Sequence, residues 1–202
     1  MNITNKVFEA LQKIPKIINR GTGAGGAATN LSGIAFESRT SIIPKLTELG
    51  YQTSLFDKTK NGYAMSKNYS THSVLFMTQG GLSKLFLENK LFRHPDESFL
   101  IIEKSSGKKT LKIIEKKNQS VSGSVDLKLA LGPYFIEEYQ EVLGPEITIE
   151  YAFCLCNFLK TEYTSDVKKW KTMRTINERH GIKVFFGEDP DYIDDVSSWV
   201  NL

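Results

Sequence analysis

The chain is poor in several residue types and patterns that would assign it to well-known protein classes. Its 202 residues include only two cysteines and three histidines. No apolar run approaches the roughly 20 residues that a helix needs to cross a bilayer. Residues 1–18 are too polar for a secretory signal. We therefore expect no membrane partner and an intracellular, cytoplasmic location.

The two cysteines add little chemistry. Cys154 and Cys156 stand two apart in a run that is typical of a strand, which places both on one face. Without a partner cluster, such a pair indicates buried thiols and not metal ligands. Sparse cysteine also favours a reducing compartment.

Signatures of nucleotide and histidine-based chemistry are missing as well. Gly21, Gly23 and Gly26 formally satisfy G-x-G-x-x-G. The dinucleotide fingerprint, however, requires a preceding strand, and a helical pattern precedes these glycines. No Gly-Lys-Ser or Gly-Lys-Thr occurs, which excludes a P-loop. The histidines are scattered, so nothing supports an HNH-type nuclease with a histidine base.

What remains is an ordinary globular composition. The chain is 40% hydrophobic and 24% charged, as is usual for soluble domains. Its length suffices for a sizeable core, and neither a repeat nor a linker divides it, so we expect a single domain over residues 1–202. The net charge of +3 permits nucleic acid as a partner without requiring it.

Helical and strand-like segments alternate along the chain. Helical periodicity covers residues 7–18, 32–49 with a division at Pro44 and a stop at Gly50, 81–92, 125–131, 133–143, 166–179 and 192–200. Strand-like runs cover residues 73–78, 98–103, 110–117, 147–158 and 183–186. Residues 21–30 and 57–70 have the composition of loops. The order predicts a mixed α/β (α+β) fold, with a central mixed β-sheet flanked by helices.

The most informative segment is T-L-K-I-I-E-K-K at residues 110–117. Because side chains alternate along a strand, Glu115 and Lys117 share a face. Asp96 follows Pro95 just before the preceding strand-like run, and K-S-S-G-K-K between the two runs predicts a hairpin. We therefore expect Asp96 and Glu115 on neighbouring strands.

An acid-x-Lys triplet alone carries no weight, because a chain with 23 acids holds about two by chance. Four occur here. Those beginning at Glu88, Asp126 and Asp166 lie in helical patterns, where residues two apart do not share a face. The triplet of Glu115 and Lys117 ends a strand and follows a Pro-Asp pair. Its alternative interpretation is a salt-bridged strand end at the surface.

Carboxylates at this place suit a divalent metal. Magnesium prefers a few carboxylates together with waters and substrate phosphate, and Asp96, Glu115 and the carbonyl of Lys116 can supply protein ligands. The metal would act as a Lewis acid and lower the pKa of a bound water, which Lys117 would orient or deprotonate. Six lysines near this run favour an anionic substrate: Lys104, Lys108, Lys109, Lys112, Lys116 and Lys117.

Asp96 with Glu115-x-Lys117 resembles the PD-(D/E)xK nuclease superfamily. The string I-I-E-K-K-N-Q-S-V-S-G-S-V-D is similar to that of type II restriction endonucleases, including those of large algal viruses. The resemblance extends to G-A-G-G-A-A-T-N, G-I-A-F-E and K-V-F-F-G-E-D-P. It implies a restriction-endonuclease-like core and a Mg²⁺-dependent, sequence-specific endonuclease of double-stranded DNA that leaves 5′-phosphate and 3′-hydroxyl ends. Mn²⁺ is expected to substitute.

The same resemblance implies partners and one further site residue. A homodimer would match a palindromic site, and a cognate DNA methyltransferase would complete the system. Glu37 matches a helix glutamate that often joins the metal site in this superfamily; its alternatives are a solvated carboxylate or an ion pair with Arg39 or Lys45. Where the family continues with an unbroken charged helix after Gly-Ser-Val-Asp, L-A-L-G-P intervenes and predicts a shorter one.

Candidates for DNA contact come from the two predicted loops and from lysines and a glutamine near the hairpin. Backbone N–H groups of the glycine-rich loop suit phosphates, and lysine and asparagine side chains suit phosphates and base edges. A flexible linker and a solvated loop are the alternatives. The candidates are Gly23, Gly25, Gly26, Asn30, Lys58, Lys60, Asn61, Lys67, Lys104 and Gln119. A repair or junction-resolving nuclease, or a non-catalytic DNA-binding protein, remains the functional alternative.

Overall fold

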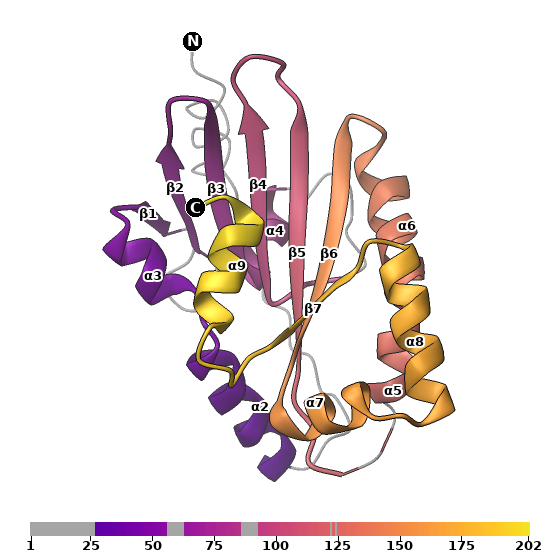
Figure 1. Cartoon of the computed structure of the whole chain (residues 1–202). Coiled ribbons are helices and arrows are strands. Elements are labelled where there is room, and N and C mark those ends of the chain that lie inside the picture. Colours follow the sequence, from indigo (N-terminus) through magenta and orange to yellow (C-terminus); the bar gives the residue numbers. More distant parts are fainter. Residues whose placement is uncertain (1–26, 56–62, 86–92, 122, 124) are drawn as a thin grey trace.

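The computed structural model describes residues 27–55, 63–85, 93–121, 123 and 125–202. Its centre is a seven-stranded sheet in which spatial order follows chain order (Figure 1). The strands are β1 (Gln52–Leu55), β2 (Tyr63–Asn68), β3 (His72–Thr78), β4 (Glu97–Glu103), β5 (Lys109–Lys117), β6 (Ile147–Leu155) and β7 (Lys183–Phe186).

The sheet is mixed, as the sequence predicts. Strands β1 to β5 form an antiparallel meander. Strands β5, β6 and β7 run parallel to one another, which requires helical crossovers between them. The change of direction at β5 makes that strand the boundary between the two halves of the sheet.

Helices supply those crossovers and cover the sheet. The described helices are α2 (Ala27–Arg39), α3 (Ile43–Glu48), α4 (Gln79–Leu85), α5 (Val125–Ala130), α6 (Gly132–Leu143), α7 (Asn157–Thr164), α8 (Lys168–Arg179) and α9 (Tyr192–Val200). In the view of Figure 1, α9 crosses in front of the sheet, α4 lies behind it, and α2 lies at the lower end, where β5 finishes.

The central strands are buried because both faces are covered. Within β6, residues from Tyr151 to Leu155 are all buried, as expected for a parallel strand between two layers of helices. Cys154 and Cys156 are free, buried thiols, which confirms the prediction made for them. The core continues through β3 and β4, where the rings of Phe76 and Phe99 pack with centroids 5.1 Å apart.

Two helix boundaries follow their predicted signals. Pro44 occupies the first turn of α3, where its missing N–H costs nothing, so the predicted division of residues 32–49 is confirmed. Helix α3 ends at Glu48. Gly50 follows with φ +77°, a conformation that glycine reaches without strain. The predicted hairpin is likewise observed, with Glu97 of β4 paired to Ile114 of β5.

Three predicted boundaries are wrong. Helix α2 begins at Ala27, so residues 27–30 are helical and not loop, and neither proposed cap at residue 30 or 32 starts a helix. Strand β2 occupies residues 63–68 of the predicted loop because pairing with β3 buries Ala64 and Met65. Strand β6 ends at Leu155, and the unpredicted helix α7 follows, since the carbonyl of Cys156 accepts the N–H of Lys160 at 2.8 Å and so begins the helix. The predictions for residues 7–18, 21–26, 57–62 and 86–92 lie outside the described residues.

Candidate functional site

The hairpin brings Asp96 and Glu115 together. Asp96 immediately precedes β4, and the β4–β5 register pairs the next residue, Glu97, with Ile114. The main-chain N–H of Lys116 donates a hydrogen bond of 2.6 Å to Oδ2 of Asp96. Because side chains alternate along β5, Glu115 and Lys117 project from one face of the sheet and Lys116 from the other.

Lys117 is paired with Glu115. The distance from Lys117 Nζ to Glu115 Oε1 is 2.5 Å, and the two side chains are only 14% and 24% exposed. The strand end is therefore salt-bridged, as the alternative interpretation has it, and the pair is partly buried. An ammonium held this way is placed beside the carboxylate, where it can donate further hydrogen bonds to a neighbouring ligand.

The acidic pair is electrostatically strained. Burial raises the pKa of Asp96 to about 7, with the nearby charge of Glu115 as the second cause; the Lys116 N–H and the Lys117 charge act in the opposite direction. Asp96 uses Oδ2 to accept the Lys116 N–H, and Glu115 uses Oε1 to pair with Lys117. A divalent cation would relieve the repulsion between the two carboxylates, so the donor set fits a hard metal ion.

Glu37, near the end of α2, lies within electrostatic range of Glu115 and Lys117. Partial burial raises the pKa of Glu37, Glu115 raises it further, and the charges of Lys116 and Lys117 lower it. Across the described segments, however, no three Asp, Glu, His or Cys side chains approach closely enough to hold a metal ion together. Glu37 therefore does not form a three-carboxylate cluster with Asp96 and Glu115 in this arrangement, and its part in a metal site stays a prediction beside those of Asp96, Glu115 and the main-chain carbonyl of Lys116.

The ion-pair alternatives for Glu37 are wrong. Arg39 instead pairs with Glu188, at 3.4 Å, and Lys45 pairs with Glu48 within α3, at 3.3 Å. The Glu37 side chain stays exposed at the end of α2.

The predicted basic neighbourhood of Glu115 is also wrong. Lys104 and Lys108 belong to the β4–β5 turn and Lys109 begins β5, about 20 Å of extended strand away from Glu115. Lys112 and Lys116 are buried on the opposite face of β5. Of these six lysines, only Lys117 lies beside the acids. The strand β5 is long and its side chains alternate between the two faces of the sheet, and a count of lysines along the sequence does not take this into account.

The predicted DNA contacts separate into three groups. Gly23, Gly25, Gly26, Lys58, Lys60 and Asn61 lie outside the described residues, and so does the side chain of Asn30, whose backbone is part of α2. Lys67 and Lys104 are used within the fold: Lys67 Nζ donates to the carbonyl of Leu49 at 2.7 Å, and Lys104 Nζ donates to that of Tyr69. Gln119 lies two residues beyond Lys117, where its N–H is 3.4 Å from Cys156 Sγ.

Sequence reasoning missed a support behind the acids. Arg93 pairs with Glu138 of α6, and its guanidinium lies 4.0 Å from the ring centroid of Phe135. Tyr139 of the same helix is buried, which raises its pKa, and the charge of Glu115 raises it further. The helical spacing of Phe135 and Tyr139 predicts burial but gives no signal of which strand residues they face.

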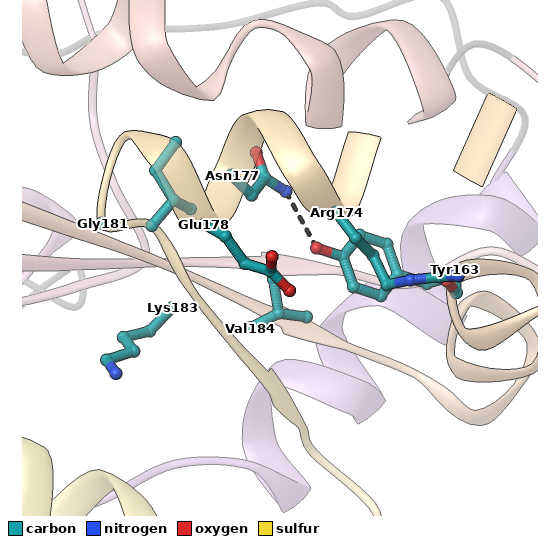
Figure 2. A pocket seen from close by; sticks show the side chains of 8 residues that line it. Tyr163, Arg174, Asn177, Glu178, Gly181, Lys183 and Val184 are labelled. Atoms are coloured by element: carbon teal, nitrogen blue, oxygen red, sulfur yellow. Dashed lines mark hydrogen bonds between the residues drawn. The ribbon is translucent and has the colours of Figure 1, made fainter. Parts of the chain in front are cut away.

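A separate pocket of about 340 Å³ lies between α7, α8 and β7 (Figure 2). Tyr163 and Asn177 meet in it, where the Asn177 amide donates to the Tyr163 hydroxyl at 3.1 Å. None of the predicted site residues lines this pocket. Asp96 and Glu115 thus lie at the end of the sheet where β4 begins and β5 finishes, outside this pocket.

Among the described residues, no helix combines the length and apolar character needed to cross a membrane. No protein-family model, curated protein or solved structure matches the chain.

Proposed function

We propose that the chain is a Mg²⁺-dependent endonuclease of double-stranded DNA, of the type II restriction class, built on a restriction-endonuclease-like core. The observation that carries the proposal is the pair of Asp96, at the residue before β4, and Glu115, on the adjacent strand β5, with Lys117 Nζ 2.5 Å from Glu115 Oε1. Two repelling carboxylates and one cation at a sheet end are the groups that metal-assisted phosphodiester hydrolysis requires.

Each residue has a distinct part in this reaction. Asp96, Glu115 and the carbonyl of Lys116 would hold the metal, which when bound supplies Lewis-acid stabilisation of the phosphoryl oxygens and a more acidic water. Lys117 would orient or deprotonate the attacking water and offset the negative charge that develops in the transition state. Water adds to phosphorus and gives up a proton, the bond between phosphorus and the 3′ oxygen breaks, and that oxygen takes up a proton, so the ends are a 5′-phosphate and a 3′-hydroxyl.

A sequence-specific enzyme of this class implies more than one chain. We propose a homodimer whose two-fold axis matches a palindromic site, accompanied in its host by a methyltransferase that protects the same site. Analytical ultracentrifugation with and without duplex DNA checks the dimer.

Digestion of long duplex DNA with Mg²⁺ tests the activity. Discrete bands support restriction, whereas a smear indicates a repair-type or junction-resolving nuclease. Retarded but intact DNA indicates a non-catalytic binding protein. Sequencing the cut ends then gives the site and the polarity.

Lys117→Ala should abolish cleavage, a loss of at least about 10²-fold, while DNA binding persists. The matched control is Lys128→Ala, which alters a second acid-x-Lys triplet on the exposed surface of α5 and should cleave normally. Undiminished cleavage by Lys117→Ala would contradict the assignment.

A further inference from the structure

Helix α6 covers the face of the sheet from which Glu115 projects. The parallel pairing of β5 with β6 places Glu115 beside Phe153, so both side chains point to one face, and Tyr151 shares that face by alternation. The Tyr151 ring packs against Phe153, with centroids 5.3 Å apart, and against Phe135 of α6, with centroids 6.0 Å apart. The aromatic side of α6 therefore lies over the face that carries Glu115.

Arg93 is held on this helix. Its guanidinium lies 4.0 Å from the ring centroid of Phe135 and 6.0 Å from that of Tyr134, and its Nε donates to Glu138. Asp96 follows three residues later, so the Cα atoms of Arg93 and Asp96 are at most about 11 Å apart. The Arg93 side chain is 40% exposed. It is a cation fixed beside the acids and open to solvent.

The environment of Tyr139 agrees with this placement. Burial raises the pKa of the Tyr139 hydroxyl, the charge of Glu115 raises it further, and the charge of Arg93 lowers it. Both charges therefore act on one hydroxyl of α6.

The guanidinium keeps donors for a further partner. An arginine has five N–H donors in a planar fork, and the pair with Glu138 uses the one on Nε. Its terminal nitrogens can bind two oxygens of one phosphate at once. The ion pair adds little to stability at this exposure, but together with the Phe135 ring it holds the fork in one orientation. Less side-chain freedom is then lost when an anion binds.

We propose that Arg93 binds a backbone phosphate of the DNA, next to the phosphate held at the Asp96–Glu115 pair. The inference rests on the proposed function, which places the scissile phosphate at those acids. One strand carries a phosphate for about every 3.4 Å of helix axis, so a neighbouring phosphate lies within the span from Asp96 to Arg93. Of the six lysines near β5 only Lys117 lies beside the acids, and Arg93 supplies the second cation there.

The salt dependence of DNA binding tests the contact. A short duplex is titrated without divalent metal, so that no strand is cut, between about 50 and 200 mM salt. Arg93→Met keeps the contact with the Phe135 ring through its thioether and removes the charge. Its affinity should fall about tenfold or more, equally for any sequence, and the slope of log K against log salt should fall by about 0.9 for each bound chain.

Arg174→Met is the matched control. The Arg174 guanidinium donates to the carbonyls of Tyr163 and Ser165 and lines the pocket between α7, α8 and β7. This variant should lose stability and keep the wild-type slope. A folded Arg93→Met protein with the wild-type slope, or an equal fall for Arg174→Met, would overturn the phosphate contact and leave the nuclease proposal intact. A wild-type protein that neither binds nor cuts duplex DNA would overturn both.

Neutral methylphosphonates, placed singly in the duplex, locate the phosphate once the cut position is known. The substitution beside the cut should weaken binding of the wild type and have no further effect on Arg93→Met, because both changes remove one contact. Additive losses at every position beside the cut would overturn the placement.

If Arg93→Met does not fold, Glu138→Gln takes its place. It keeps an oxygen for the Nε–H of Arg93 and removes a negative charge that opposes the phosphate, so the duplex should bind severalfold more tightly. Glu178→Gln removes the same charge at the pocket and should bind as wild type. Unchanged or weaker binding by Glu138→Gln would overturn the contact.

Discussion

The main-chain N–H of Lys116 donates to Asp96 Oδ2 at 2.6 Å, so the strand that carries Glu115 also fixes the carboxylate across from it. This bond uses one oxygen of Asp96, Oδ2. Glu115 and Lys117 stand on a strand, which is the more rigid way to hold a constellation, and the Lys116 bond fixes Asp96 at the residue before β4.

Asp96→Asn should stabilise the metal-free protein at pH 8. The pKa of Asp96 is raised to about 7 in the folded state against about 3.9 unfolded. The folded state therefore keeps a proton that the unfolded state releases, and wild-type stability falls as pH rises from about 4 to 7. Asparagine can accept the same Lys116 bond without the charge.

Urea denaturation at pH 4 and pH 8 checks this. The variant should match wild type at pH 4 and exceed it at pH 8, by on the order of 2 kcal/mol. The control variant Asp126→Asn in α5, which loses an ion pair with Lys169, should show no such gain. An Asp96→Asn protein less stable than wild type at pH 8 would contradict the strain in the acidic pair.

Divalent metal affinity should depend on pH through the same group. Carboxylate ligands bind as anions, and Asp96 holds its proton below about pH 7. The affinity for Mn²⁺ should therefore fall by up to about tenfold for each pH unit below 7 and level off above it. Calorimetric titrations at pH 5.5, 6.5 and 8 measure this, and a flat profile would argue against Asp96 as a ligand.

Adding a side chain at Gly187 should destabilise the protein. A Cβ at this position would lie 2.5 Å from Thr40 Cγ2 and 2.7 Å from Cys154 Sγ, where the last loop crosses α2 and β6. Gly187→Ala should cost roughly 1–3 kcal/mol of unfolding free energy through overpacking.

The control is Gly33→Ala within α2, where a Cβ meets nothing within 4 Å. It should stabilise the protein by up to about 1 kcal/mol through helix propensity. Thermal melts of both variants decide the point, and equal effects would show that the crossing is not tight.

Lys67→Ala should weaken folding and leave DNA binding unchanged. The Lys67 ammonium donates to Leu49 O and lies 4.9 Å from the ring centroid of Tyr69, so it already has partners in the free protein. Gel retardation at several salt concentrations should give the wild-type slope, whereas a loss of one phosphate contact would reduce that slope by about one.

Local signals in the sequence suffice for the elements in which several of those signals agree. The apolar, alternating run at residues 110–117 and the turn before it gave the β4–β5 hairpin, and with it the meeting of Asp96 and Glu115. Pro44, Gly50 and the 192–200 helix likewise follow from local chemistry. These features are decided within a few residues, where backbone preferences and side-chain period act directly.

The long-range packing of the chain determines which charged side chains lie at the site. Lys112 and Lys116 look the same as Lys117 in the sequence, yet strand alternation and the helices α9 and α2 bury them in contacts with distant carbonyls. The pairing of Lys116 with the buried Glu97 and the exposed position of Glu37 depend on the same long-range packing. The burial of a side chain and the charges that act on it depend on segments that are distant in the sequence and meet in the fold. A local sequence pattern therefore identifies the residues of the site but not their partners.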